Sequence, residues 1–152
     1  MKQILLIGAG RSSGSLIDYL IANASENDWR ICIADLSIER LQEEYEKVAC
    51  IRLKVFDVAD AEKRAALIEE SNIVISMLPA HLHIEVAKDC IRLKKNMVTA
   101  SYISDEMKAL DEKARAAGVL ILNEIGVDPG IDHLSAKKVI DEILEKGGKM
   151  EA

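Results

Sequence analysis

Six short apolar segments recur along the chain, and polar stretches long enough for one helix each separate them. The segments begin near Ile4, Ile31, Ile51, Ile73, Met97 and Val119. Four of them, ILLI, ICIA, IVIS and VLIL, show no alternation with polar residues, which is typical of parallel strands with helices on both faces. The pattern predicts the α/β class, with a doubly wound parallel sheet of about six strands covered by helices on both faces.

The third apolar segment and the stretches between the segments refine this prediction. Residues 51–56, IRLKVF, alternate apolar and basic positions, which places this strand at an edge of the sheet. Ser37, Asp60 and Ser104 are residue types suited to N-caps, and a proline such as Pro129 is tolerated in the first turn of a helix. The helices predicted from these signals span residues 37–48, 60–70, 104–117 and 129–146.

Three glycines stand between the first apolar segment and the first expected helix, in the stretch LLIGAGRSSGSL. In the Rossmann fold the first such glycine makes a tight turn, the second lets a pyrophosphate contact the backbone, and the third permits close helix packing. Gly8 and Gly10 fit the first two roles, but the third strict position is Ser13, one residue before Gly14. We expect a pyrophosphate site formed by Gly8, Gly10, Arg11, Ser12, Ser13 and Gly14; a turn that serves only the fold is the alternative.

Asp35 ends the second apolar segment, 25 residues after Gly10. A carboxylate at this place accepts hydrogen bonds from the ribose hydroxyls of adenosine and repels a 2′-phosphate, so it favours NAD as the cofactor. Arg40 is the nearest basic residue and leaves NADP open. A plain loop or cap role for Asp35 is the alternative.

Two other strand ends carry candidates for the same ligand. Asp57 and Val58 close the third strand, where a side chain can meet the adenine, although a simple loop acid is an equal alternative. The stretch SMLPAH, which includes Ser76, Leu78 and Pro79, lies beside the expected nicotinamide half.

His81, His83 and Glu85 resemble a set of metal ligands, because alternate residues of a strand face the same way. The apolar spacing of the residues that follow predicts a helix start instead, on which alternate residues point apart. We therefore expect no metal site.

Length and composition limit the class of protein. The chain has 152 residues, of which 49% are hydrophobic and 30% charged, and this suits one domain over residues 1–152. The net charge of −6, with scattered basic residues, argues against a nucleic-acid partner. The sequence has no apolar run of about 20 residues and no secretory cleavage pattern, so we expect a soluble, cytoplasmic protein. Cys32, Cys50 and Cys90 are expected to be reduced thiols without a chemical role.

Three longer stretches carry a family resemblance: ILLIGAGRSSGSLIDYL, SMLPAHLHIEVAKDCIRLKKNMVTASYISDEM and LNEIGVDPGIDHLSA. They are similar to the N-terminal cofactor domain of glutamate-forming saccharopine dehydrogenases, and the resemblance covers nearly the whole chain. ASY together with GVDPGIDH is its most specific part. The resemblance implies NAD(P)-linked hydride transfer at the carbon–nitrogen bond of saccharopine, which joins or splits glutamate and aminoadipate semialdehyde in lysine metabolism.

The same resemblance implies roles for individual residues. Leu78, Pro79 and Ser101 would lie on the nicotinamide side, and Tyr102, Asp128, Pro129, Gly130 and Asp132 would face an amino-acid-derived substrate. Ordinary capping is the alternative for Asp128 and Asp132, which lie near a helix start. His133 is a candidate proton carrier, but the sequence names no general base.

Enzymes of this family carry a second domain with most of the substrate and dimer contacts, whereas this sequence ends at Ala152. We therefore expect cofactor binding without full activity, and a homodimer is left open. One alternative is a stand-alone nucleotide-sensing Rossmann module, such as the regulators of potassium transport, which resemble only the first 60 residues or so. Another is an enzyme similar to carboxynorspermidine dehydrogenase.

Overall fold

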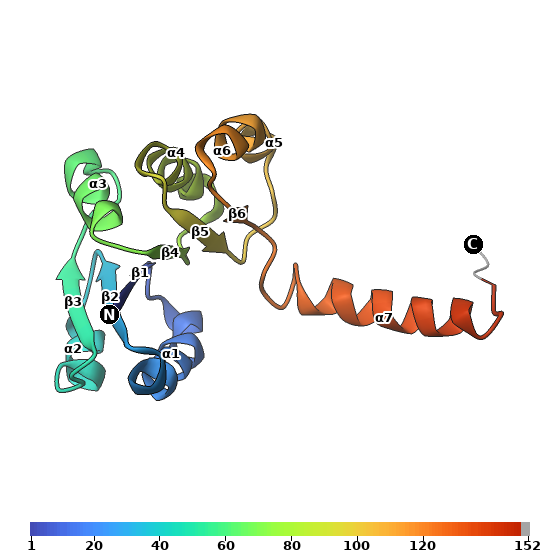
Figure 1. Ribbon diagram of the computed structural model, residues 1–152. Helices are drawn as coiled ribbons and strands as arrows, with labels where there is room; N and C mark the ends of the chain where they lie inside the picture. Colours follow the sequence, from blue (N-terminus) through green and yellow to red (C-terminus); the bar gives the residue numbers. More distant parts are fainter. Residues whose placement is uncertain (150–152) are drawn as a thin grey trace.

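A computed structural model describes residues 1–149 and contains a sheet of six strands in the order β3-β2-β1-β4-β5-β6 (Figure 1). The strands are β1 (Lys2–Ile7), β2 (Trp29–Asp35), β3 (Ile51–Val55), β4 (Ile73–Ser76), β5 (Asn96–Thr99) and β6 (Ile121–Leu122). Every neighbouring pair is parallel. The predicted α/β class and the edge position of the third strand are confirmed. The last three residues of the domain expected over 1–152 lie outside the described part.

Helices cover the two faces of the sheet unevenly (Figure 1). One face carries α1 (Gly14–Asn27) and α2 (Glu39–Tyr45), which lie over the first three strands. The other face carries α3 (Ala61–Glu69), α4 (His83–Leu93), α5 (Asp105–Lys108) and α6 (Asp111–Ala117). Two short 3-10 helices, η1 (Arg11–Ser13) and η2 (Ala80–Leu82), precede α1 and α4.

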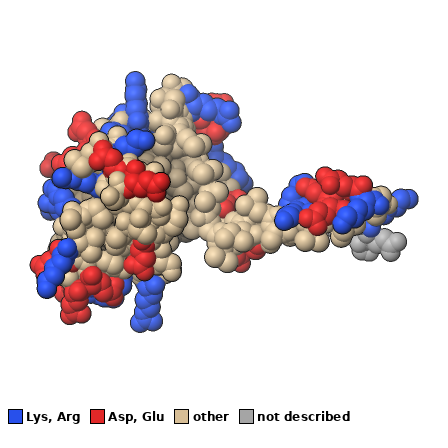
Figure 2. Space-filling model, turned by 60° about the horizontal axis from the view of Figure 1, so that its bottom comes forward, with Lys and Arg blue, Asp and Glu red and all other residues tan. Residues whose placement is uncertain are grey.

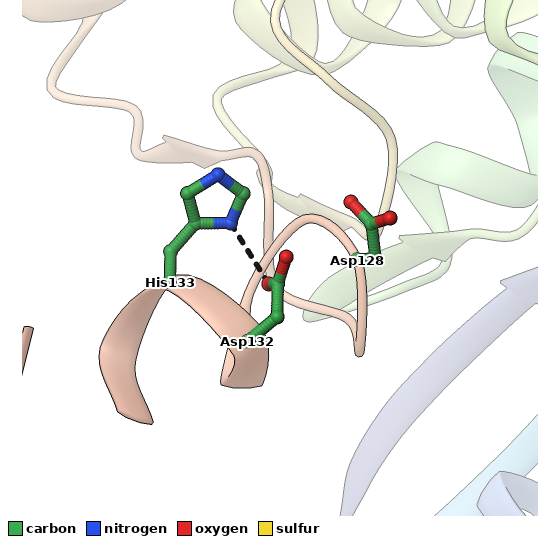
Figure 3. Close-up of side chains that lie close together, drawn as sticks. All are labelled: Asp128, Asp132 and His133. Carbon is green, nitrogen blue, oxygen red and sulfur yellow. Dashed lines mark hydrogen bonds and ion pairs between the residues drawn. The ribbon is translucent and has the colours of Figure 1, made fainter. Parts of the chain in front are cut away.

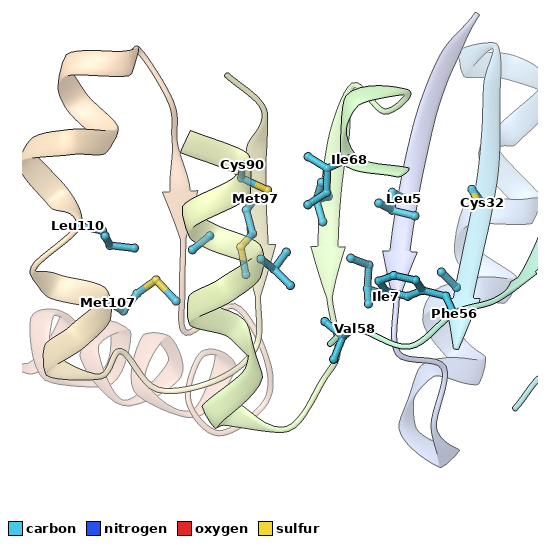
Figure 4. Packing of buried hydrophobic residues seen from close by; sticks show 14 residues of the cluster. Leu5, Ile7, Cys32, Phe56, Val58, Ile68, Cys90, Met97, Met107 and Leu110 are labelled. Carbon is cyan, nitrogen blue, oxygen red and sulfur yellow. The ribbon is translucent and has the colours of Figure 1, made fainter. Parts of the chain in front are cut away.

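The apolar strands feed two hydrophobic layers because successive side chains of a strand point to opposite faces. On one face, Leu6 of β1 belongs to a buried cluster with Ile17 of α1. On the other face, Leu5 of β1 belongs to a second cluster with Val86 and Cys90 of α4 (Figure 4). This double coverage explains why the central strands have no polar alternation. Burial also raises the pKa of the Cys90 thiol to about 12, which suits an unreactive thiol.

Two of the three predicted N-caps are confirmed. The side chains of Asp60 and Ser104 each accept the backbone N–H three residues further on, at 3.1 Å. The third prediction is wrong, because the Ser37 hydroxyl donates to the Glu39 carboxylate and α2 has no side-chain cap.

The single helix predicted over 104–117 consists of two helices, α5 and α6. At the junction, the N–H of Leu110 donates to the carbonyl of Met107, three residues back, at 3.1 Å. This tighter turn brings Met107, Leu110 and Ala114 into buried positions.

Helix α7 (Ile131–Glu145) projects away from the sheet, and none of its residues is buried (Figure 1). In Figure 2 its charged side chains gather along one side, and other residues occupy the opposite side. In the part of the chain that the structure describes, no helix has the length and apolar character needed to cross a bilayer.

Candidate functional site

The turn after β1 requires glycine at its first position. Gly8 has a φ of +86°, and a Cβ atom there would lie 2.9 Å from the carbonyl carbon and oxygen of Met77. The backbone is held on both sides, since the Gly8 N–H donates to the Ala34 carbonyl and the Met77 N–H donates to the Ile7 carbonyl. Gly8 therefore places the turn directly between the ends of β2 and β4.

The other two glycines of the motif differ from Gly8, because a Cβ atom at Gly10 or Gly14 would meet nothing within 4 Å. Gly10 is exposed, so its backbone is open to a ligand. The close-packed position is Ser13, which is buried and donates its hydroxyl to the Gly10 carbonyl at 2.7 Å. The expected packing role of a third glycine thus falls to Ser13, and Gly14 has no such role. Arg11 and Ser12 are exposed in η1.

Asp35 reaches the glycine turn from the end of β2. Its carboxylate accepts the N–H of Ala9 at 2.6 Å and the N–H of Ser37 at 3.1 Å. Arg40 approaches the same turn and donates to the Ala9 carbonyl at 2.8 Å. The sequence predicts that Asp35 binds the ribose hydroxyls, and no local pattern predicts the hydrogen bonds by which Asp35 and Arg40 hold the backbone of the turn in place.

A crevice of about 270 Å³ opens at the carboxyl ends of β1, β2 and β4. The strand order reverses direction between β1 and β4, and ligands of doubly wound folds bind at this kind of switch point. The predicted residues that line the crevice are Gly8, Gly10, Asp35, Val58, Leu78 and Pro79. Asp57 does not line it, and its carboxylate accepts the N–H of Ala59 within its own turn.

A larger hollow of about 640 Å³ lies between α5, α6 and β6 and is lined in part by Met107, Leu110 and Ala114. None of the residues predicted to bind nucleotide or substrate lines it. We therefore place the nucleotide site in the smaller crevice.

On the other side of the switch point, a buried histidine joins two strand ends. Nδ1 of His83 lies 2.8 Å from the hydroxyl of Ser76, and Nε2 lies 2.8 Å from the hydroxyl of Ser101. Burial, with a smaller contribution from His81, lowers the pKa of His83. Ser76 is fully buried, so its side chain does not face the crevice as the sequence suggested, whereas Ser101 is partly exposed. In the sequence, His83 stands out only in a metal-like pattern that the helix spacing argues against, and no local pattern predicts its contacts with Ser76 and Ser101.

The GVDPG stretch forms a tight loop before α7. The N–H of Gly126 donates to the Pro129 carbonyl at 3.0 Å, and the N–H of Ile131 donates to the Gly126 carbonyl at 2.9 Å. Gly130 has a φ of +148°, and a Cβ atom there would lie 2.1 Å from the Gly126 carbonyl oxygen. Because the backbone of Gly130 lies directly against that of Gly126, the helix begins only at Ile131. The predicted start at Pro129 is therefore wrong. Pro129 and Gly130 are buried and shape the loop.

Exposed acidic groups gather at this loop (Figure 3). The Tyr102 hydroxyl donates to Asp128, and this hydrogen bond raises the pKa of Tyr102 to about 12. Oδ1 of Asp132 lies 2.8 Å from Nδ1 of His133, and this hydrogen bond raises the pKa of His133. One ligand atom from each of Asp128, Asp132 and His133 lies within 4.8 Å of the others. The cluster is anionic and open, which suits a cationic group of a small molecule.

The sheet order, the glycine turn at the switch point and the carboxylate at the end of β2 define a Rossmann dinucleotide-binding domain. Residues 4–122 match the family model described as the saccharopine dehydrogenase NADP binding domain. The chain belongs to this family.

Relatives of known activity agree with this assignment. Saccharopine dehydrogenase [NADP(+), L-glutamate-forming] of Saccharomyces cerevisiae is 36% identical over 99% of this chain and 33% of its own length. Alpha-aminoadipic semialdehyde synthase of Arabidopsis thaliana is 36% identical over 98% of this chain and 16% of its own. The solved structure of apo saccharopine dehydrogenase (L-Glu forming) from Saccharomyces cerevisiae superposes with a TM-score of 0.86 and 35% identity, over all of this chain and 33% of that one. The chain thus spans one third or less of these relatives.

Proposed function

We propose that this chain is the NAD(P)-binding portion of an oxidoreductase that acts on the CH–NH bond of saccharopine in lysine metabolism. The observation that carries the proposal is the likeness to glutamate-forming saccharopine dehydrogenase along the whole chain, including the loop that carries the acidic cluster. The cytoplasmic location and the absence of a nucleic-acid partner, both expected from the sequence, are part of the proposal.

The residues of the crevice fit a dinucleotide. The open backbone at Gly10 and the turn held by Gly8 would receive the pyrophosphate, while Asp35 and Val58 would lie along the adenosine. The cofactor supplies hydride transfer, and the protein supplies binding, orientation and electrostatics.

The choice between the two nucleotides rests on Asp35 and Arg40. The charge of Asp35 favours the free ribose hydroxyls of NAD, whereas Arg40, beside the same turn, offers a positive charge to a 2′-phosphate. Asp35→Ala would also remove the acceptor for the Ala9 N–H, so Asp35→Asn is the better variant. We expect Asp35→Asn to lower the affinity for NAD relative to NADP, and Arg40→Met to do the reverse.

The acidic cluster is proposed to bind the substrate. Asp128 and Asp132 are exposed carboxylates next to Tyr102, which follows Ser101 directly in the chain. Saccharopine carries protonated amino groups, so two carboxylates would hold it electrostatically and by hydrogen bonds. Tyr102, held by Asp128, would orient the same group.

Calorimetric titration of the chain with NADPH, NADH and saccharopine tests the proposal. We expect nucleotide binding, saccharopine binding in the presence of nucleotide, and little turnover. Asp128→Asn should weaken saccharopine binding and leave nucleotide binding unchanged. Asp111→Asn, which removes an exposed acid paired with Arg115 on α6, is the matched control and should alter neither. A wild-type chain that binds no nucleotide would refute the proposal.

A further inference from the structure

The His83 imidazole lies where two strands of the sheet end. It begins α4, and its ring contacts Ser76, the last residue of β4, and Thr99, the last residue of β5. Ser101, two residues beyond β5, completes the set. His83, Ser76 and Thr99 are each at most 2% exposed, whereas Ser101 is partly exposed. The group therefore leads from the interior to the surface, and Ser101 is its outer member.

The contacts of the two ring nitrogens favour one arrangement of protons. A neutral imidazole has one N–H donor and one nitrogen acceptor. Nε2 lies 2.8 Å from the Ser101 hydroxyl oxygen and 3.1 Å from the Thr99 hydroxyl oxygen. One N–H can be shared between two oxygen acceptors, whereas two hydroxyl donors would compete for one lone pair. Thr99 also accepts the Ser101 N–H at 3.3 Å, as an acceptor should.

A proton on Nε2 has a consequence at each end of the group. Nδ1 is then the acceptor, and the buried Ser76 hydroxyl donates to it. At the other end, Ser101 accepts from Nε2, so its own hydroxyl proton is not used by the ring. That proton is free for a ligand at the carboxyl ends of β4 and β5, on the side of the switch point away from Asp35.

We propose that His83 is a positioning residue that fixes Ser101 as a hydrogen-bond donor to the nicotinamide end of the dinucleotide. The inference rests on the proposed function, because it requires a bound dinucleotide. The nicotinamide carboxamide carries an oxygen that accepts such a bond. Ser76 and Thr99 act on the ligand only through His83.

Paired ligands separate this role from a purely structural one. NADPH and 2′-phospho-ADP-ribose differ only by the nicotinamide, as do NADH and ADP-ribose. The variants are compared with the wild type using whichever pair the wild type binds more tightly. Ser101→Ala should weaken the nicotinamide-containing ligand about threefold to tenfold, the size expected for one hydrogen bond, and change the affinity for its partner less than about twofold. This variant removes only a partly exposed hydroxyl, so it tests the inference even if His83 variants fold poorly.

Two conservative variants of His83 complete the test. His83→Gln carries an amide N–H near the position of Nε2 and should retain most of the affinity, whereas His83→Asn reaches only the position of Nδ1 and should behave like Ser101→Ala. The double variant His83→Asn with Ser101→Ala should bind no more weakly than Ser101→Ala alone. In the wild type, long-range proton–nitrogen NMR spectra should show the His83 proton on Nε2.

The outcomes distinguish two failures. If the wild type binds both members of a pair, and the variants weaken both equally or neither, the positioning role is refuted while nucleotide binding stands. A His83 proton on Nδ1 would also refute it. If the wild type binds neither member of either pair, the proposed function fails and the inference fails with it.

Discussion

Replacing each of the three glycines of the first turn by alanine should have three different effects on stability and nucleotide binding. Gly8→Ala forces alanine to a φ of +86°, which costs about 1 to 2 kcal/mol. Its methyl group would also lie 2.9 Å from the Met77 backbone, an overlap that costs about 1 to 3 kcal/mol more. Lower entropy of the unfolded chain offsets about 0.4 to 1 kcal/mol. The expected net loss in the free energy of unfolding is about 1 to 5 kcal/mol.

Gly10→Ala should affect the ligand instead of the fold. Gly10 has φ −67° and ψ −171°, a conformation that alanine adopts, and its Cβ atom would meet nothing within 4 Å. Stability should change by less than about 0.5 kcal/mol. The added methyl group would occupy the space through which a pyrophosphate reaches the backbone, so nucleotide affinity should fall about tenfold or more.

Gly14→Ala is the matched control, because Gly14 is already helical, with φ −53°, and has open space around it. It should gain about 0.5 to 1 kcal/mol and keep the nucleotide affinity of the wild type. Urea unfolding followed by the fluorescence of Trp29, the single tryptophan, gives the stabilities, and calorimetry gives the affinities. Equal instability of Gly8→Ala and Gly10→Ala, or full nucleotide affinity in Gly10→Ala, would refute the assignment of separate roles.

Two further variants test the interior and the acidic cluster. Arg64→Met removes the buried guanidinium that lies 2.7 Å from Asp89 and also donates to the Val58 carbonyl. Asp89 keeps its ion pair with Arg92, so the variant should cost about 1 to 3 kcal/mol in urea unfolding, chiefly because the buried Val58 carbonyl loses its donor. Arg115→Met, which breaks an exposed pair, should cost less than about 1 kcal/mol, and equal losses would contradict this account. Asp128→Asn replaces the negative carboxylate that accepts the hydrogen bond of the Tyr102 hydroxyl with a neutral amide. The pKa of Tyr102 should therefore fall from about 12 toward 10 in an ultraviolet titration. An unchanged titration curve would show that Asp128 does not hold Tyr102 in solution.

The strand order and the turn after β1 could be predicted from local patterns. Uninterrupted apolar runs identify buried parallel strands, and the alternation in β3 identifies an edge. Gly8 and Asp35 were predictable because the geometry of one strand–turn–helix unit fixes their spacing. These signals depend on residues close in sequence or on a single repeated unit.

Other features depend on contacts that no local pattern encodes. Ser76 looks like a candidate for the crevice until the sheet places it beneath His83, seven residues later and in a different element. Gly14 looks like the third glycine of the motif in the sequence, but the close-packed position at the start of α1 belongs to Ser13. Pro129 is a good first residue for a helix, but the backbone crossing at Gly130 takes precedence over local preference.

Because α7 lies apart from the sheet, its backbone hydrogen bonds should open more easily than those of the sheet. Its 15 residues have no buried side chain, and an isolated helix of this length is marginally stable in water. The amide protons of α7 should therefore exchange with deuterated solvent through local fraying, long before those of β1, whose strand is paired on both sides. We therefore expect urea unfolding to report the sheet and its two layers of helices, and the amide protons of α7 to gain protection when another surface covers its apolar side.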